Sequence, residues 1–96
     1  MKGYALAEVE VTDPALFETY RPLAAAAIAA HGGRYLIRGG AAERVEGTHP
    51  DRRIVLLEFD SPERARAWYH SPEYQHAKSI RERAARTEVF LIDGHP

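Results

Sequence analysis

The chain contains no cysteine. Disulfide bridges, thiolate metal sites and a cysteine nucleophile are therefore excluded together. The chain also lacks an apolar run of the roughly 18 residues that a membrane-spanning helix needs, and its start, Met1-Lys2-Gly3-Tyr4, leads into a strand pattern without a signal-peptide core. We therefore expect a cytoplasmic protein with no membrane partner.

Neither sign of charge dominates. The 13 basic and 14 acidic side chains leave a net charge of −1. A nucleic-acid-binding domain usually has a clustered basic excess, whereas the densest basic stretch here, residues 78–86, is interrupted by Glu82. We expect no nucleic-acid partner.

The motifs of cofactor-dependent and metal-dependent enzymes are also absent. The sequence has no phosphate-binding Walker loop, no GxGxxG after a strand, no GxSxG elbow, and no HxxxH or HxxH pair. Two histidines at such spacing would be needed for a zinc site on one helical face. We therefore predict no bound cofactor and no metal, so an enzyme built on this chain would be cofactor-free or would use the reactivity of its substrate.

What is present is the pattern of one small domain covering residues 1–96, of which 45% are hydrophobic. Alternating and 3.6-residue periodicities predict seven elements: strand 4–11, helix 14–31, strand 34–38, strand 53–59, helices 62–70 and 72–85, and strand 87–92. This order is the ferredoxin-like βαββαβ pattern of the α+β class. It predicts a four-stranded antiparallel sheet with both helical regions on one face.

Several residues mark where the helices start and stop. Asp13-Pro14 is a capping residue followed by a first-turn proline, and Ser61-Pro62-Glu63 and Ser71-Pro72-Glu73 repeat this signal ten residues apart. The repeat predicts two helical pieces joined at a corner. Pro22 is expected to kink or split the first helix, and Gly39-Gly40 to form a turn or a bulge.

The strands are too apolar for a sheet with one exposed face. Residues 35–37, 54–57 and 89–92 are continuous apolar runs, which place apolar side chains on both faces. A large exposed apolar face is rare on a monomer, and a second copy packed sheet against sheet is the simplest cover. The sequence predicts a homodimer; the alternative is a monomer with an apolar open face.

Two longer stretches are similar to a known family. They are His31-Gly-Gly-Arg-Tyr-Leu-Ile-Arg-Gly-Gly40, and Phe59-Asp-Ser-Pro-Glu63 leading into Ala67-Trp-Tyr69 and Ser71-Pro-Glu-Tyr-Gln75. Together they resemble the family catalogued as domain of unknown function 1330. The resemblance implies a dimeric α/β barrel, in which two ferredoxin-like sheets pack face to face. The wider superfamily includes cofactor-free monooxygenases, lactone isomerases and haem proteins, so fold alone does not indicate the reaction.

Arg38 and Glu58 are the charged candidates for a site. Arg38 precedes Gly39-Gly40, where glycines would let the backbone approach a ligand and the guanidinium would clamp an anion. Glu58 stands among apolar neighbours and would have a raised pKa, suited to a general base, if it had no partner. The alternative for both is structural: Arg38 pairs with Glu8 or Glu58 across the sheet, and the carboxylates form ion pairs with arginines.

Aromatic residues around the helical corner are the other candidates. Trp68, Tyr69 and Tyr74 would line a pocket between helix and sheet, with Tyr20 from the first helix, and Tyr69 is a candidate for proton transfer. The alternative is that Trp68 is plain core.

These residues support three functions. The first is a small cofactor-free enzyme, monooxygenase- or isomerase-like, acting on a compact anionic molecule. The second is a metabolite-binding module, and the third is a dimerisation domain without a ligand. Whether the chain is an enzyme is left open by its sequence.

Overall fold

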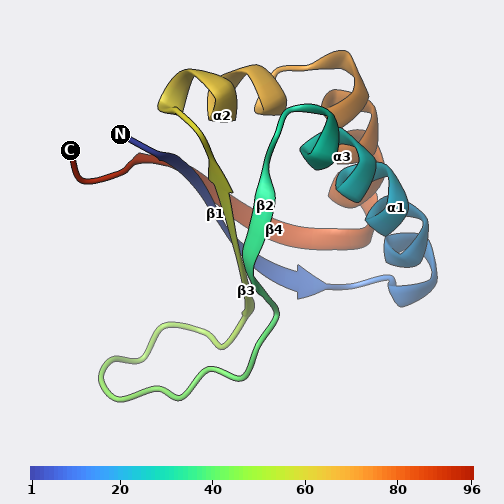
Figure 1. Cartoon of the computed structure of the whole chain (residues 1–96). Coiled ribbons are helices and arrows are strands. Elements are labelled where there is room, and N and C mark those ends of the chain that lie inside the picture. The colour runs from blue at the N-terminus through green and yellow to red at the C-terminus, as the bar shows by residue number, and fades with distance from the viewer.

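The computed structural model describes residues 1–96, and its element order is the one that the sequence predicts. The elements are β1 (Gly3–Val11), α1 (Pro14–Ala30), β2 (Arg34–Arg38), β3 (Arg53–Phe59), α2 (Pro62–Tyr69), α3 (Pro72–Ala84) and β4 (Ala85–Asp93). The strands form one antiparallel sheet in the order β2-β3-β1-β4. The helices lie on one side of this sheet (Figure 1), so the ferredoxin-like prediction is confirmed.

The helix boundaries follow the capping residues. The Asp13 carboxylate accepts a hydrogen bond from the Leu16 N–H (3.1 Å), and Gly32, with φ of +72°, takes the left-handed conformation just beyond α1. The hydroxyls of Ser61 and Ser71 cap α2 and α3 in the same way. The predicted corner between two helical pieces is therefore confirmed, whereas α1 runs through Pro22 without being split.

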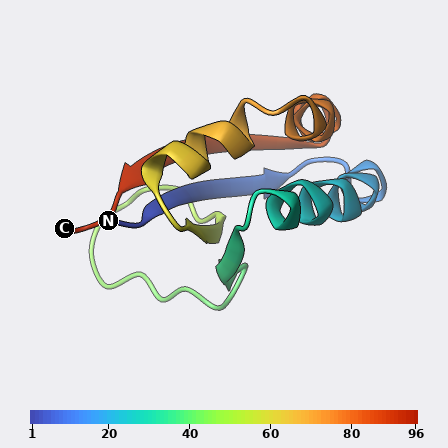
Figure 2. The same ribbon diagram turned by 45° about the horizontal axis from the view of Figure 1, so that its top comes forward.

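Gly39-Gly40, expected to form either a turn or a bulge, forms a turn after β2. β2 ends at Arg38, and its register shift lies between Tyr35 and Ile37, before the glycine pair. Gly39, with φ of +70°, turns the chain into the loop formed by residues 40–52, which extends away from the helices (Figures 1 and 2). The glycines thus end the strand instead of forming a bulge within a longer one.

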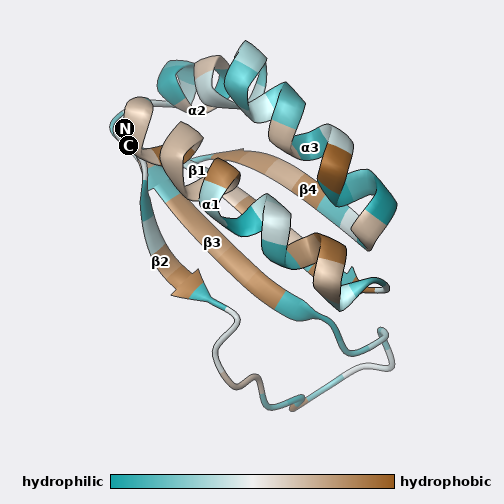
Figure 3. Ribbon diagram, turned by 90° about the vertical axis from the view of Figure 1, so that its right-hand side faces the viewer, coloured by the Kyte–Doolittle hydropathy of each residue, from teal (hydrophilic) through white to brown (hydrophobic).

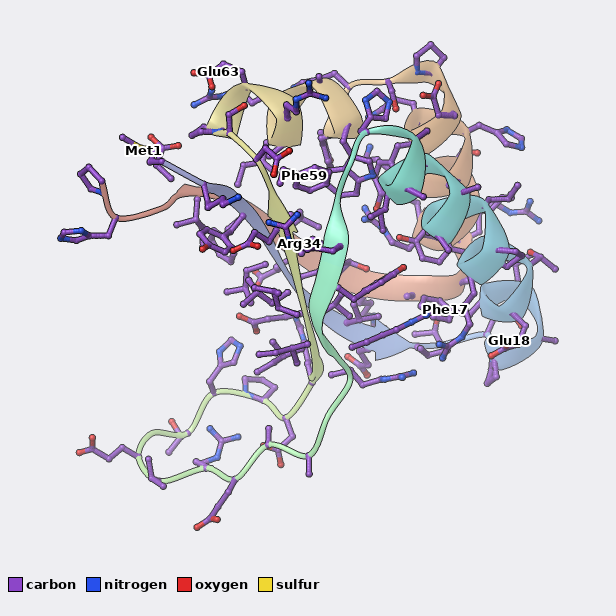
Figure 4. All side chains as sticks on the ribbon, viewed as in Figure 1. Met1, Phe17, Glu18, Arg34, Phe59 and Glu63 are labelled. Carbon is purple, nitrogen blue, oxygen red and sulfur yellow. The ribbon has the colours of Figure 1, made fainter.

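The helix-covered face of the sheet carries the hydrophobic core. Ala5 and Val9 of β1, and Leu57 and Phe59 of β3, are buried beneath the helices. Phe17 and Phe59 both belong to this layer (Figure 4), packed from α1 and from β3 respectively. β1 contributes only small side chains to the middle of this face, Ala5 and Ala7, which leaves space under α1.

The opposite face, which we call the open face, has no helix over it. Ile37, Leu56, Leu6 and Phe90 stand side by side across all four strands, as the strand register requires. We call this row the apolar band; Ile37 and Phe90 at its ends are 42% and 49% exposed. Figure 3 shows hydrophobic residues running along β3 and into β2 and β4. None of the three helices combines the length and the hydropathy that crossing a bilayer requires.

Candidate ligand-binding site

A cavity lies between the helix-covered face of the sheet and the helices. Most of its lining is hydrophobic, 13 of its 18 residues. Ala5, Ala7 and Val9 of β1 line it together with their neighbours on β3 and β4, and Ala24 of α1 lines it from the helix layer. Small side chains at the centre of both layers are thus the local reason why space remains there.

The polar lining of the cavity is one-sided in charge. Arg21, Arg38, Arg53 and Arg81 line it, and no aspartate or glutamate does. Arg21 is paired with Glu18 on the same helix, whereas Arg38, Arg53 and Arg81 take part in no ion pair within the chain. The cavity is therefore apolar in its walls and positive in its charge, the combination that suits an organic anion.

Arg81 is the most unusual of these arginines. It is only 6% exposed, its Nη1 donates a hydrogen bond to the Tyr74 hydroxyl (3.0 Å), and its Nε has no partner. A buried guanidinium ordinarily has a carboxylate partner, because burying an unpaired charge is costly. Its place one turn before the end of α3 gives it only the partial compensation of the helix dipole.

The hydrogen-bonded chain continues from Arg81 into α1. The Tyr74 and Tyr20 hydroxyl oxygens lie 2.9 Å apart, so one of the two phenols donates to the other. Because Tyr74 accepts from Arg81, a bond donated by Tyr74 to Tyr20 would leave the Tyr20 proton available for a ligand. Burial raises the pKa of Tyr20 well above its usual range, and this hydroxyl is therefore neutral in the folded protein.

Arg38 lies on the cavity side of the sheet, at the edge strand. Its guanidinium stacks over the Tyr35 ring, 4.4 Å from the ring centroid. It pairs with neither Glu8 nor Glu58, so the ion pair across the sheet that was the structural alternative does not form. Arg38 remains a candidate anchor for an anion at the cavity.

Glu58 lies on the open face, on the other side of the sheet from the cavity. Its carboxylate accepts hydrogen bonds from the Tyr4 hydroxyl (2.9 Å) and from Arg34 Nε (2.7 Å), and these two donors hold the pKa of Glu58 below its usual range. The arrangement matches the ion-pair alternative for this residue, with Arg34 as the arginine. A paired, ionised carboxylate on the wrong face does not fit the general-base role, because it neither borders the cavity nor has the raised pKa that the role needs.

The glycine pair contributes to the cavity indirectly. The Gly39 N–H donates to the Ile54 carbonyl (2.9 Å) and is thus not free for a ligand. A Cβ on Gly39 would lie 2.7 Å from Arg53 Nη2, so glycine makes room for the guanidinium of Arg53. Gly40 lines a wider, more open groove that shares Val9, Phe17, Arg21 and Arg53 with the cavity.

Three of the four aromatic candidates line the cavity, and the fourth does not. Trp68, Tyr74 and Tyr20 line the cavity, and the rings of Trp68 and Tyr74 lie 4.3 Å apart between centroids. Tyr69 does not line it; it packs behind Trp68 and Tyr74, with its carbonyl accepting from Gln75. The structure therefore brings Arg38, Tyr20, Trp68 and Tyr74 to one cavity and places Glu58, Gly39 and Tyr69 outside it.

Sequence reasoning missed Arg81, Arg53 and Thr87, which also line the cavity. The sequence could have placed Arg81 beside Tyr74, because it follows Tyr74 by seven residues and therefore lies two turns along the same face of α3. No local pattern in the sequence could have placed Arg53 and Thr87 in the cavity. They lie close together only because both pair with Val9 in the sheet.

One group on the open face has the composition of a metal site. Glu8, His49 and Glu88 place one ligand atom each within 4.8 Å of one another. His49 already bonds Glu8 (2.5 Å), and Arg52 lies 3.6 Å from Glu88. Ion pairing within the chain explains the cluster, and we assign no metal to it.

Comparisons with known proteins place the fold and leave the chemistry open. The model of a family described as domain of unknown function (DUF1330) matches residues 2–95. No curated protein sequence matches the chain.

Solved structures with the same fold share little sequence with this chain. RPA0582, a protein of unknown function from Rhodopseudomonas palustris, has a TM-score of 0.80 at 13% identity, over 99% of this chain and 83% of the other. A dimeric ferredoxin-like protein of unknown function from Thermobifida fusca has a TM-score of 0.64 at 15% identity, over 98% and 92% of the two chains. SnoaB, a cofactor-independent oxygenase from Streptomyces nogalater, has a TM-score of 0.61 at 13% identity, over 99% and 94%.

Proposed function

The chain belongs to the family described as domain of unknown function (DUF1330), and from that premise we propose that it is a small cofactor-free enzyme acting on a compact organic anion held in the cavity. The observation that carries the proposal is the buried, unpaired Arg81 in a cavity lined by four arginines and no acid. An anionic ligand would supply the missing negative charge. Arg38, at the edge strand, would attract and hold the same ligand from outside.

The chemistry that this lining supports is stabilisation of negative charge on a substrate oxygen. When a proton leaves a carbon next to a carbonyl, charge develops on the oxygen, where neutral hydroxyls and a guanidinium stabilise it. The Tyr20 hydroxyl, linked through Tyr74 to Arg81, is such a donor. Return of the proton at another carbon gives an isomer. Reaction of the carbanion with O₂ converts a methylene to a carbonyl and releases the second oxygen atom as water.

Two features favour this class of reaction over others. SnoaB has the same fold and is a cofactor-independent oxygenase, so the fold accommodates chemistry without a cofactor. No histidine or carboxylate lines the cavity, so the proton acceptor would be an oxygen of the substrate itself. This second feature also favours the alternative, a metabolite-binding module that performs no reaction.

The test compares Arg81→Met with Arg83→Met, an exposed arginine two residues further along α3. A panel of compact carboxylates is screened by thermal shift and then by calorimetry. We expect Arg81→Met to weaken binding at least ~100-fold, as loss of a buried charge-assisted contact does, and Arg83→Met to leave it unchanged. Equal binding by both variants would overturn the proposal.

Conversion of any bound acid is then followed by NMR with and without O₂. Product in air only indicates an oxygenase, and product in both conditions an isomerase. Tight binding with no product assigns the protein to the binding alternative.

We also propose that two copies associate through their open faces. The apolar band is exposed at its ends, the face has no helix cover, and three of the similar structures are described as dimeric. A dimer would bury the band between two sheets, as in the barrel that the family resemblance implies. The cavity lies on the other face and would remain open in such a dimer.

A further inference from the structure

Unpaired polar atoms are concentrated at the cavity. In the whole chain four buried side-chain polar atoms have no hydrogen-bond partner: Arg52 Nε, Trp68 Nε1, Arg81 Nε and Thr87 Oγ1. Three of these belong to residues that line the cavity. A buried donor without an acceptor is rare in folded proteins and calls for an explanation, of which an absent ligand is one. Two of the three groups, the indole and the guanidinium, can only donate, so the missing partners are acceptors.

The three groups mark two separate ends of the cavity. Thr87 is paired with Val9 in the same cross-strand row as Arg53, towards the end of β1. Trp68 instead packs on Phe59, with 5.2 Å between ring centroids, and Phe59 is paired with Gly3 at the start of β1. The indole therefore lies at one end of the cavity floor, and Thr87 lies at the other.

Tyr74 contacts both the Trp68 indole and the Arg81 guanidinium. Its ring lies 4.3 Å from the Trp68 ring between centroids, and its hydroxyl lies 3.0 Å from Arg81 Nη1. Trp68 and Arg81 therefore both contact Tyr74, one at its ring and the other at its hydroxyl. A ligand that reaches both must carry two acceptors, one for each donor.

Charge and burial decide which acceptor belongs at which end. Arg81 is the only buried arginine of the lining; Arg21 is half-buried, and Arg38 and Arg53 are exposed. The enclosed part of the ligand therefore has one positive charge to meet, which fits a carboxylate with a single negative charge better than a doubly charged phosphate. The indole N–H fits a neutral oxygen.

We propose that the ligand is a compact carboxylic acid with a second acceptor oxygen, a carbonyl or a hydroxyl. The carboxylate meets Arg81, and the second oxygen meets the Trp68 indole N–H. The inference rests on the proposed function, because it specifies the substrate class of the same cavity. It assigns Trp68 a role in ligand selection beyond its place in the core.

The test uses two matched pairs of probes. Pentanoate and 4-oxopentanoate differ by one carbonyl, and benzoate and 4-hydroxybenzoate differ by one hydroxyl. Affinities are measured by calorimetry for the unmodified protein, Trp68→Phe, Arg81→Met and the control Arg83→Met. We expect the oxygen-bearing member of at least one pair to bind roughly 5- to 10-fold more tightly, the usual effect of one neutral hydrogen bond. Trp68→Phe should abolish this difference between the two members of the pair.

A second measurement does not depend on the Trp68→Phe variant folding. Trp68 is the only tryptophan, so the protein gives a single indole N–H signal in a ¹⁵N-correlated NMR spectrum. Binding of the preferred oxygen-bearing acid should shift this signal downfield, and the simpler acid should not.

The outcomes separate this inference from the proposed function. If both members of each pair bind equally and the indole signal moves with neither, the inference is overturned; loss of that binding in Arg81→Met would still support the anion-binding cavity. If no acid binds, both proposals are overturned. A preference that Trp68→Phe leaves intact also overturns the inference, since the second oxygen then meets another donor.

Discussion

The two faces of this sheet differ in whether their charged side chains have ion-pair partners. On the open face, Glu58 is bonded by Arg34 and Glu8 by His49, so the carboxylates have partners within the chain. On the helix-covered face, Arg38, Arg53 and Arg81 border the cavity without any carboxylate. The more deeply buried charge is thus the unpaired one, the reverse of what stability alone would favour.

This contrast indicates what each face is for. Paired charges around the apolar band can be buried against a second copy without leaving an isolated ion, so the open face is suited to a protein partner. Unpaired positive charge inside an apolar cavity is unfavourable until an anion arrives. The helix-covered face is therefore suited to a small ligand, and the cost of holding Arg81 there is offset on binding.

The largest effect should come from placing a charge in the apolar band. Phe90→Lys puts an ammonium at one end of the apolar band, within the proposed interface, and we expect the dimer dissociation constant to rise at least ~100-fold, as at interface hot spots. Light scattering coupled to size exclusion measures the change. Val45→Lys, at an 81% exposed loop position, is the matched control and should leave association unchanged. If the unmodified protein is monomeric at high concentration, the open face is not a dimer interface and the proposal is wrong.

The next effect concerns the stability of the ligand-free protein. Arg81→Met replaces an unpaired buried charge with an apolar side chain of similar length, so we expect the free energy of unfolding to be unchanged or to rise by ~1–3 kcal/mol. Urea denaturation measures it, with Arg83→Met expected within about 0.5 kcal/mol of the unmodified protein. A clear loss of stability in Arg81→Met would show that the charge of Arg81 is compensated in the ligand-free chain, and the contrast between the faces would then fail.

A pH series tests the paired charge on the open face. The pKa of Glu58 is lowered in the folded protein by Tyr4 and Arg34, so its stabilising contribution is complete above the unfolded pKa of about 4.3 and is lost as the pH falls through the lower folded value. We expect the melting temperature of the unmodified protein to fall more steeply than that of Glu58→Gln below about pH 5. Ligand binding should be equal in the two proteins, and a loss of binding in Glu58→Gln would return Glu58 to the site.

Local signals made the fold predictable. Capping residues at Asp13, Ser61 and Ser71 each act within a few residues of chain, and all three mark helix starts in the structure. Strand periodicity was equally local, and it indicated apolar side chains on both faces of the sheet. These features need no knowledge of which segments meet in space.

The site was less predictable because it depends on long-range pairing. Glu58 and Arg38 both looked like site residues in the sequence, but the strand register places them on opposite faces. The Leu36 register shift is one reason, since a single extra residue in β2 reverses which side chains face the helices from that point on. Arg53 and Thr87 became neighbours of Val9 only through the sheet.

The smallest effect concerns a neutral hydroxyl on the helix-covered face. Burial raises the pKa of Tyr20 far above its usual value, so this phenol should stay protonated wherever the protein stays folded. Following tyrosinate absorbance with pH, we expect Tyr20→Phe to match the unmodified protein up to the alkaline unfolding transition. In denaturant all five tyrosines titrate, and the variant should lose one fifth of the absorbance change. A difference already present in the folded protein would mean that solvent reaches Tyr20, and the cavity would then lack the dry hydroxyl that stabilising a substrate oxyanion requires.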